Sequence, residues 1–112
     1  MEAQPSLPSD WAVACTDGQV TVTDPVYLVR WSFPKSLLDH DWNRPHPIEL
    51  YDPLVGLGDL AQEERDLLAL ATGIAERNRD LTRLGEALGL KPPYGGCRVA
   101  RYLVMAVSGS LA

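Results

Sequence analysis

Residues 59–91 constrain the fold more than any other segment, because helix periodicity, caps and stop signals agree there. The first half spaces its apolar residues so that one face of an amphipathic helix carries Leu60, Leu67, Leu68, Leu70, Ala71, Ile74 and Ala75. Asp59 is expected to cap this helix, and Gln62 completes a capping-box-like pattern. The helix should end near residues 77–79.

A second, shorter helix is predicted directly after the first. Asp80 can cap its N-terminus, and its apolar face consists of Leu81, Leu84 and Leu88. Gly89 stands where a helix C-terminus often adopts a positive φ, and Leu90 is the apolar residue that often follows it. Pro92 and Pro93 prevent the helix from continuing. The segment therefore supplies two consecutive helices and much of the core.

The N-terminal third carries a β pattern. Asp17-Gly18 is the preferred dipeptide of a type I′ hairpin turn, and the residues on both sides of it alternate between the two faces of a strand. Asp24-Pro25 should end this hairpin. A third strand is expected over residues 26–33, which are rich in β-branched and aromatic side chains. One face of that strand would carry Tyr27, Val29, Trp31 and Phe33.

Residues 97–108 fit either a helix or a buried strand. A helix is favoured because the segment contains the good helix formers Ala100, Arg101, Leu103, Met105 and Ala106. Gly109 is expected to stop it. Strands followed by helices predict one α+β domain over residues 10–112, in which a small antiparallel sheet packs against two or three C-terminal helices. Residues 1–9 contain two prolines and small polar residues, and we expect a flexible arm there.

Length and charge limit the class of protein. A chain of 112 residues is typical of one domain, and a net charge of −5 disfavours a general nucleic-acid binder. No apolar run approaches the roughly 18 residues of a membrane span, so no membrane partner is expected. Cys15 and Cys97 lack a CxxC pattern, which favours two free, buried thiols over a disulfide. With no secretory signal evident, we expect a cytoplasmic protein.

The long segment 35–58 is the first candidate for a functional site. Residues 36–39 can form one helical turn, three prolines exclude a long helix, and residues 48–51 can form a short edge strand. Aromatic side chains next to carboxylates are frequent at protein interfaces, and here they are Trp42, Tyr51, Asp39 and Asp41. The alternative is that the aromatic residues pin the loop to the domain. The leading interpretation is a small intracellular, non-enzymatic protein-binding module of inhibitor, antitoxin, immunity or adaptor type.

The alternative function is nucleic-acid binding by a basic helical patch over residues 77–101. The patch consists of Arg77, Arg79, Arg83, Lys91, Arg98 and Arg101, opposed only by Asp80 and Glu86. Residues 81–90 resemble the first helix and turn of a helix-turn-helix. The sequence departs from that motif at Pro92 and Pro93, which stand where the recognition helix would begin.

Enzymatic candidates are weaker. Metal ligation by an HDWNRPHPIELYD loop would use His40, Asp41, His46, Glu49 and Asp52, but the two histidines match no standard ligand spacing. Cys97 follows two glycines and could act as a nucleophile at a helix N-terminus, although a structural cysteine is more common. Gly56 and Gly58 lack the remaining residues of a dinucleotide or phosphate loop. We therefore expect no catalytic residue, no metal and no cofactor.

Overall fold

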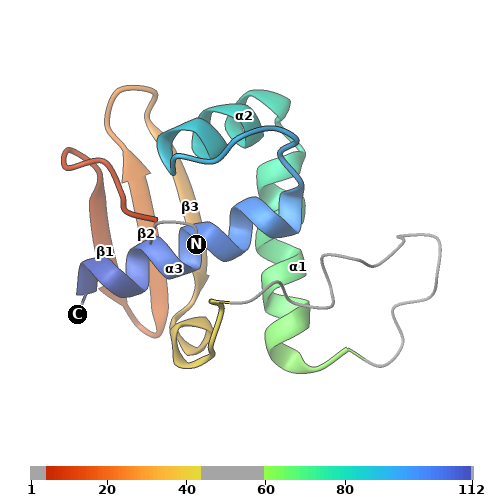
Figure 1. Cartoon of the computed structure of the whole chain (residues 1–112). Helices are drawn as coiled ribbons and strands as arrows, with labels where there is room; N and C mark the ends of the chain where they lie inside the picture. Colours follow the sequence, from red (N-terminus) through yellow and green to blue (C-terminus); the bar gives the residue numbers. More distant parts are fainter. Residues whose placement is uncertain (1–4, 44–59, 112) are drawn as a thin grey trace.

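The computed structural model describes residues 5–43 and 60–111 and places the strands before the helices in the chain (Figure 1). In chain order the elements are β1 (Ala12–Thr16), β2 (Gln19–Asp24), β3 (Val29–Pro34), the 3-10 helix η1 (Lys35–Asp39), α1 (Gln62–Ala75), α2 (Asn78–Ala87) and α3 (Gly96–Leu111). The strands form one antiparallel sheet in the order β1-β2-β3. The predicted α+β class is therefore confirmed.

The N-terminal hairpin forms as predicted. Asp17 has a φ of 53° and Gly18 a φ of 77°, the two positive values that a type I′ turn requires. Thr16 faces Gln19 across the turn, and the register continues without a bulge to Ala12 opposite Thr23. The dipeptide alone therefore located this turn correctly.

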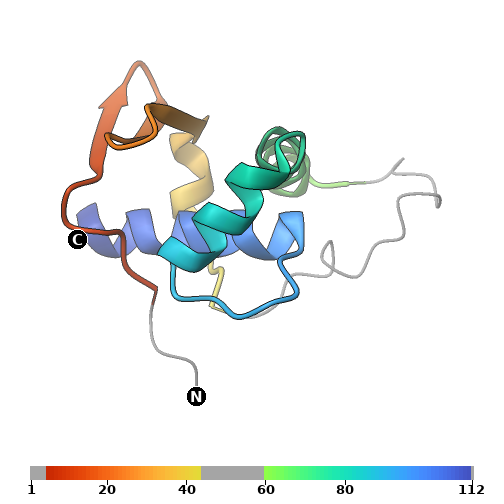
Figure 2. The same cartoon turned by 90° about the horizontal axis from the view of Figure 1, so that it is seen from above.

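The core lies between one face of the sheet and the helices. From above, α3 runs across the sheet, and it packs against α1 (Figure 2). Val22 and Phe33 are buried on this face, and the ring of Trp31 stacks on that of Trp11 with the centroids 5.3 Å apart. Trp31 is a core residue, since it is only 5% exposed.

The third strand begins later than predicted, at Val29 instead of residue 26. Residues 25–28 form the turn between β2 and β3, so the placement of Tyr27 on a strand face is wrong. The physical reason is the carboxylate of Asp24, which accepts hydrogen bonds from the backbone N–H groups of Val26 and Tyr27. These bonds hold the backbone in a turn and take its donors out of the strand ladder.

Both predicted caps are displaced from the expected residues. The N-cap of α1 is Ala61, whose N–H donates to Glu64 Oε1 at 3.1 Å, so the expected cap on Asp59 is wrong, and Asp59 itself lies outside the described residues. The N-cap of α2 is Arg77, which places Asp80 inside the first turn. A carboxylate there still interacts favourably with the helix dipole.

The C-terminus of α2 confirms the predicted glycine stop. Gly89 has a φ of 78° and donates its N–H to the carbonyl of Glu86 at 3.0 Å. Leu90 donates to the carbonyl of Gly85 at 2.9 Å, and its side chain is buried. This pair of bonds is the Schellman arrangement.

The C-terminal segment is helical, as favoured from the sequence. The helix α3 packs against η1, α1 and α2. Its buried residues include Val99, Ala100, Tyr102, Leu103, Val104, Ala106 and Val107. The predicted stop at Gly109 is wrong, because the helix continues to Leu111. One glycine costs a helix only about 1 kcal/mol relative to alanine. Within the described part of the chain, no helix has the length and apolar character needed to cross a bilayer.

Three shorter segments have mixed outcomes. The single helical turn expected over residues 36–39 is confirmed as η1. In the predicted arm, Pro5 is buried and Leu7 packs against the core, while the flexibility of residues 1–9 stays a prediction. The possible edge strand over residues 48–51 lies outside the described residues.

Cys15 and Cys97 form no disulfide, as predicted, but their expected burial is wrong. Cys15 is exposed because β1 is an outer strand of the sheet. Cys97 is half-buried in the first turn of α3.

Candidate protein-binding site

The turn between β2 and β3 presents an apolar tip, which consists of Val26, Tyr27 and Leu28. Their exposed fractions are 68%, 60% and 80%. Among the described residues only one other large hydrophobic side chain, Leu111, is comparably exposed. Single exposed apolar side chains are ordinary on protein surfaces, but a consecutive group of large ones marks a candidate interaction site.

The apolar tip is built on a buried carboxylate. Asp24 is fully buried, and its Oδ1 accepts the N–H of Val26 at 2.9 Å and that of Tyr27 at 3.4 Å. Its Oδ2 accepts a hydrogen bond from Arg83 Nε at 2.6 Å. Each oxygen of the carboxylate thus has a donor, which is the condition for burying such a charge.

The electrostatics keep this pair ionised. Burial by itself raises the pKa of Asp24, but the hydrogen bonds from Arg83 and from the Val26 and Tyr27 N–H groups lower it by more, so the net pKa lies below that of an ordinary aspartate. The same bond to Asp24 raises the pKa of Arg83. Both groups are therefore charged at neutral pH, and the turn is held in one conformation.

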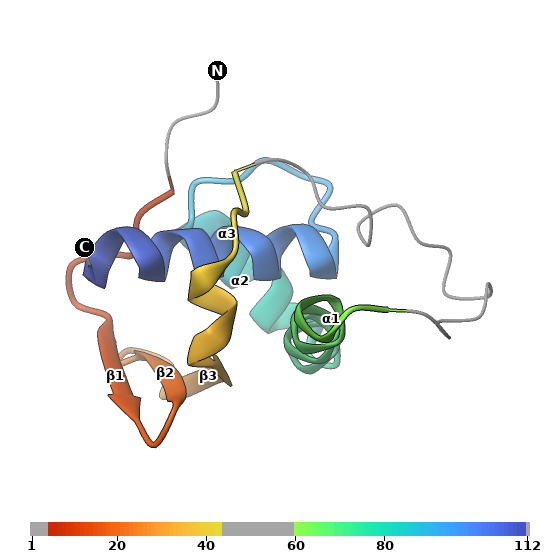
Figure 3. The ribbon, with the colours of Figure 1, turned by 90° about the horizontal axis from the view of Figure 1, so that it is seen from below.

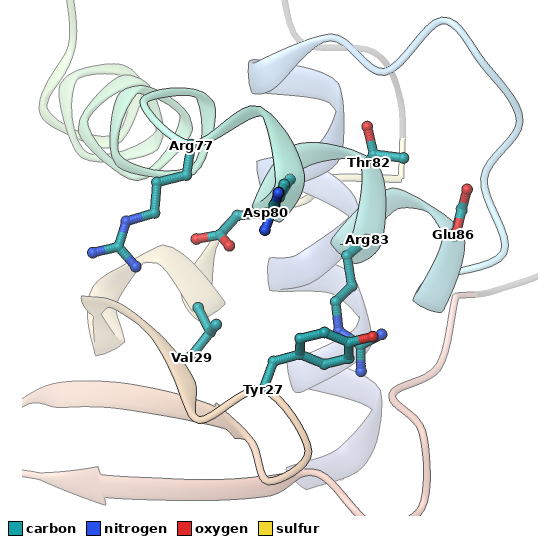
Figure 4. A pocket seen from close by; sticks show the side chains of 8 residues that line it. Tyr27, Val29, Arg77, Asp80, Thr82, Arg83 and Glu86 are labelled. Carbon is teal, nitrogen blue, oxygen red and sulfur yellow. The ribbon is translucent and has the colours of Figure 1, made fainter.

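The guanidinium of Arg83 also holds the aromatic side chain of the apolar tip. Its Cζ lies 3.6 Å from the centroid of the Tyr27 ring, and Figure 4 shows the two side chains meeting between the turn and α2. A cation–π contact at an exposed site contributes about 0.5–1 kcal/mol. This contact limits the rotamers that the exposed ring of Tyr27 can adopt.

Leu28 occupies a backbone conformation that does not suit it. Its φ of 56° lies in the left-handed region, which costs a non-glycine residue roughly 1–2 kcal/mol. Glycine or asparagine would fit this position with less strain. The leucine contributes little to the core, since 80% of its side chain is exposed. The strain at Leu28 is therefore not offset by burial of its side chain in the core.

An open groove of about 860 Å³ runs beside the apolar tip, between the turn and α2 (Figure 4). Tyr27 and Val29 lie on its sheet side, and α2 and the residue before it contribute Arg77, Arg79, Asp80, Thr82, Arg83 and Glu86. Charges of both signs surround an apolar surface, as at the edge of a protein interface. Such a lining offers contacts to a side chain of a partner.

Trp42, the leading residue of the predicted interface, is a core residue. Its side chain is only 3% exposed, and its Nε1 donates to the carbonyl of Leu37 at 2.6 Å. The expectation of a surface-exposed ring is therefore wrong, and the alternative that Trp42 pins the loop is supported. Asp39 and Asp41 are exposed, and Tyr51 lies outside the described residues. Partner binding by these two carboxylates stays a prediction.

The predicted basic patch does not form one cationic surface. Arg101 is 4% exposed and donates to the carbonyl of Trp42 at 2.7 Å. Arg98 donates to the carbonyls of Lys91 and Pro93, and Arg83 is paired with Asp24. Of the six patch residues, Arg77, Arg79 and Lys91 are exposed. Half of the patch is thus engaged in holding the fold together.

The helix-turn-helix resemblance is not supported by the helix that follows residues 81–90. Residues 88–95 separate α2 from α3, which is longer than the three- to four-residue turn of that motif. The next helix, α3, is buried along most of its length and cannot present a side to a groove of DNA. The resemblance arose from local helix and glycine signals alone.

Only some of the enzymatic candidates lie in the described part of the chain. Within residues 5–43 and 60–111, no group of three or more histidine, cysteine, aspartate or glutamate side chains could hold a metal ion. The ring of His40 packs edge-on against that of Trp42, with the centroids 5.8 Å apart. His46, Glu49, Asp52 and residues 56–58 lie outside the described part.

No protein-family model, curated protein or solved structure matches this chain.

The apolar tip was missed in the sequence because its side chains were assigned to a strand. The available signal was Asp24-Pro25, a turn-initiating pair followed directly by large apolar residues. An aspartate before the turn, combined with an arginine on a distant helix, decides that these side chains point to solvent.

Proposed function

We propose that this chain is a small non-enzymatic protein-binding module, of inhibitor, antitoxin, immunity or adaptor type, that docks through the apolar tip. The observation that carries the proposal is the exposure of Val26, Tyr27 and Leu28 on a turn that Asp24 and Arg83 hold in place. A partner with an apolar pocket would bury all of these side chains at once.

The energetics favour a tip of this composition. A few buried aromatic or aliphatic anchors carry most of the binding energy at an interface, each contributing about 2 kcal/mol or more. Tyrosine adds a hydroxyl that can bond at the rim while its ring is buried. The mixed charges of α2, including Arg79 and Glu86, line the groove beside the apolar tip and would set the orientation of the partner.

The proposal keeps the carboxylates predicted from the sequence and the predicted cytoplasmic setting. Asp39 and Asp41 are exposed and can contribute polar contacts, whereas Trp42 acts by supporting the segment that carries them. A reducing, cytoplasmic setting agrees with the free and exposed thiol of Cys15.

Site-specific cross-linking tests the proposal. A photoreactive phenylalanine derivative is placed at Leu28, and at Ser32 on the exposed face of β3 as a matched control. In the native host, we expect one protein to be cross-linked from position 28 and not from position 32, and mass spectrometry identifies it. The purified partner should then bind Leu28→Ser about thirtyfold more weakly than wild type, the equivalent of about 2 kcal/mol.

Two outcomes would count against this site. Equal cross-linking from both positions, or an unchanged affinity of Leu28→Ser, would show that the apolar tip does not dock. Binding of duplex DNA that weakens steeply with salt, and that is lost in Arg77→Gln/Arg79→Gln, would favour the nucleic-acid alternative. Arg83 is left unchanged in that test because it holds the apolar tip.

A further inference from the structure

Among the described residues, no strand pairs with the outer side of β1, which is therefore an open edge of the sheet. Because the strand order is β1-β2-β3, β1 and β3 are the outer strands, and α1 packs against β3. Figure 3 shows β1 at the side of the sheet farthest from α1. Within β1, Val13 is half-buried and the other residues are exposed. Unpaired backbone groups on such an edge are a template for another strand.

The protections usual for an exposed edge strand are absent from β1. Its sequence, Ala-Val-Ala-Cys-Thr over Ala12–Thr16, contains no charged residue and no proline. Its pairing with β2 has no bulge that would twist the edge away. Natural sheets commonly block association with lysine, proline or a bulge on the outer strand. This edge is therefore open to strand addition.

The register shows which backbone groups point outward. Across the Asp17-Gly18 turn, Thr16 and Gln19 form a hydrogen-bonded pair, and such pairs alternate along an antiparallel ladder. Ala14 and Ala12 therefore also bond to β2, whereas Val13 and Cys15 direct their N–H and C=O groups to the open side.

The part of the β1 edge that is open to pairing is limited by Trp11 on one side and Asp17 on the other. At one end, the N–H of Trp11 already donates to the carbonyl of Pro8 at 3.1 Å. At the other end, Asp17 leaves the extended conformation with a φ of 53°. The free groups thus belong to Val13 and Cys15, and they lie symmetrically about Ala14.

We propose that two copies of this chain associate by antiparallel pairing of their β1 strands, with the two-fold axis at Ala14. Val13 of each copy then exchanges both backbone hydrogen bonds with Cys15 of the other. If the axis lay at Val13 instead, Cys15 would face Trp11 of the other copy, and if it lay at Cys15, Val13 would face Asp17. In both of these registers a backbone hydrogen bond is lost. Only the Ala14 register pairs every free group, and this self-complementarity selects a second copy as the occupant.

Side chains fit this arrangement on both faces. Ala14 lies opposite Ala14 of the second copy, where a non-hydrogen-bonded pair brings side chains closest together. On the core face, half-buried Val13 meets the exposed Cys15 of the other copy, so apolar surface is buried across the seam. No like charges face each other, since Asp17 falls opposite Trp11.

The pairing forms one continuous sheet with the helices of both copies on the same face. Because the paired strands run in opposite directions, the two apolar tips would lie at opposite ends of the dimer. If the proposed function holds, the dimer therefore presents two docking sites. The dimer itself does not depend on that function, since β1 and the apolar tip share no residue.

Charge pairing at the two-fold axis tests the inference. Sedimentation velocity of the wild-type chain should show a concentration-dependent dimer, whereas Ala14→Lys and Ala14→Glu should each sediment as monomers because like charges meet at the axis. An equal mixture of the two variants should recover the dimer mass. Ser32→Lys, on the same face of the sheet but on β3, is the matched control and should remain dimeric.

Disulfide trapping provides a second readout. In a Cys15→Ser background, Ala14→Cys should form an intermolecular disulfide on mild oxidation, because the facing Cα atoms lie about 4.5 Å apart in this pairing. Ala12→Cys should form no such disulfide, since in this register residue 12 faces Thr16 of the other copy and the two introduced cysteines lie far apart. A monomeric wild type at high concentration, or a dimer that survives both charge variants, would overturn the inference. Leu28→Ser should stay dimeric, so failure of the apolar tip and failure of the dimer are distinguishable.

Discussion

Residues 24–28 and 39–42 both combine aspartate with an aromatic residue, yet the fold treats them in opposite ways. In the first segment the carboxylate of Asp24 is buried and the ring of Tyr27 is exposed. In the second, Asp39 and Asp41 are exposed and the ring of Trp42 is buried. Composition therefore did not determine which side chain faces solvent.

The difference comes from what an arginine of a distant helix binds in each segment. Arg83 of α2 binds the carboxylate of Asp24, which draws the acid inward and leaves the turn side chains outside. Arg101 of α3 instead binds the backbone carbonyl of Trp42, and the indole N–H bonds to Leu37. Two residues of the predicted basic patch thus hold these segments to the helices.

The largest effect should come from Trp42→Ala. Removing a buried tryptophan leaves a cavity and takes from the Leu37 carbonyl its shorter hydrogen bond, the other being the one from the His40 N–H at 3.5 Å. We therefore expect a loss of about 3–5 kcal/mol of unfolding free energy, measured by urea denaturation. Tyr27→Ala, the corresponding exposed aromatic, should cost only about 1 kcal/mol through the lost cation–π contact. Similar losses for the two variants would remove the distinction between core and surface.

A smaller effect is expected for Asp24→Ala. The change leaves the N–H groups of Val26 and Tyr27 without their acceptor and unpairs Arg83, so we expect to lose about 2–3 kcal/mol of unfolding free energy. The apolar tip should also lose its fixed conformation, which backbone NMR shifts of residues 25–28 would report. A variant with wild-type stability would show that Arg83 and the turn do not depend on this carboxylate.

Acid should weaken the same interaction. Since the pKa of Asp24 is lowered in the folded state, the unfolded chain binds the proton first, and stability falls as pH drops below the ordinary aspartate pKa of about 4. Denaturation curves between pH 7 and pH 2 should converge for wild type and Asp24→Asn, because the contribution of the charged pair disappears from the wild type. A constant difference across this range would contradict the assignment.

Leu28→Gly should act in the opposite direction. Glycine accepts the φ of 56° without strain, so the variant should gain about 1 kcal/mol of stability while losing affinity for the partner. Thermal unfolding and binding to the cross-linked partner measure the two effects. A loss of stability would mean that the leucine side chain supports the fold.

The smallest effect is expected for Asp39→Ala. The side chain is exposed at the end of η1, and surface substitutions of this kind usually change the unfolding free energy by less than about 0.5 kcal/mol. Urea denaturation checks this against Asp24→Ala. If Asp39→Ala lowered the unfolding free energy as much as Asp24→Ala, the two segments would not differ in how their aspartates contribute to stability.

Features that depend on neighbouring residues were predictable from the sequence by itself. The Asp17-Gly18 turn and the Gly89 helix stop form because glycine and aspartate accept a positive φ and the closing hydrogen bonds are local. The α+β class followed from strand and helix periodicities, and the helix over residues 97–108 from propensity. In each case the deciding interactions lie within a few residues.

The start of β3, the burial of Trp42 and the position of the apolar tip were decided only by the tertiary structure. Asp24 bonds to Arg83, and Trp42 to Arg101, across 59 residues of sequence in both pairs. A local sequence pattern does not distinguish an arginine that binds a partner from an arginine that binds its own chain. Which of them an arginine does depends on where packing of the helices places it, and that is a property of the whole fold.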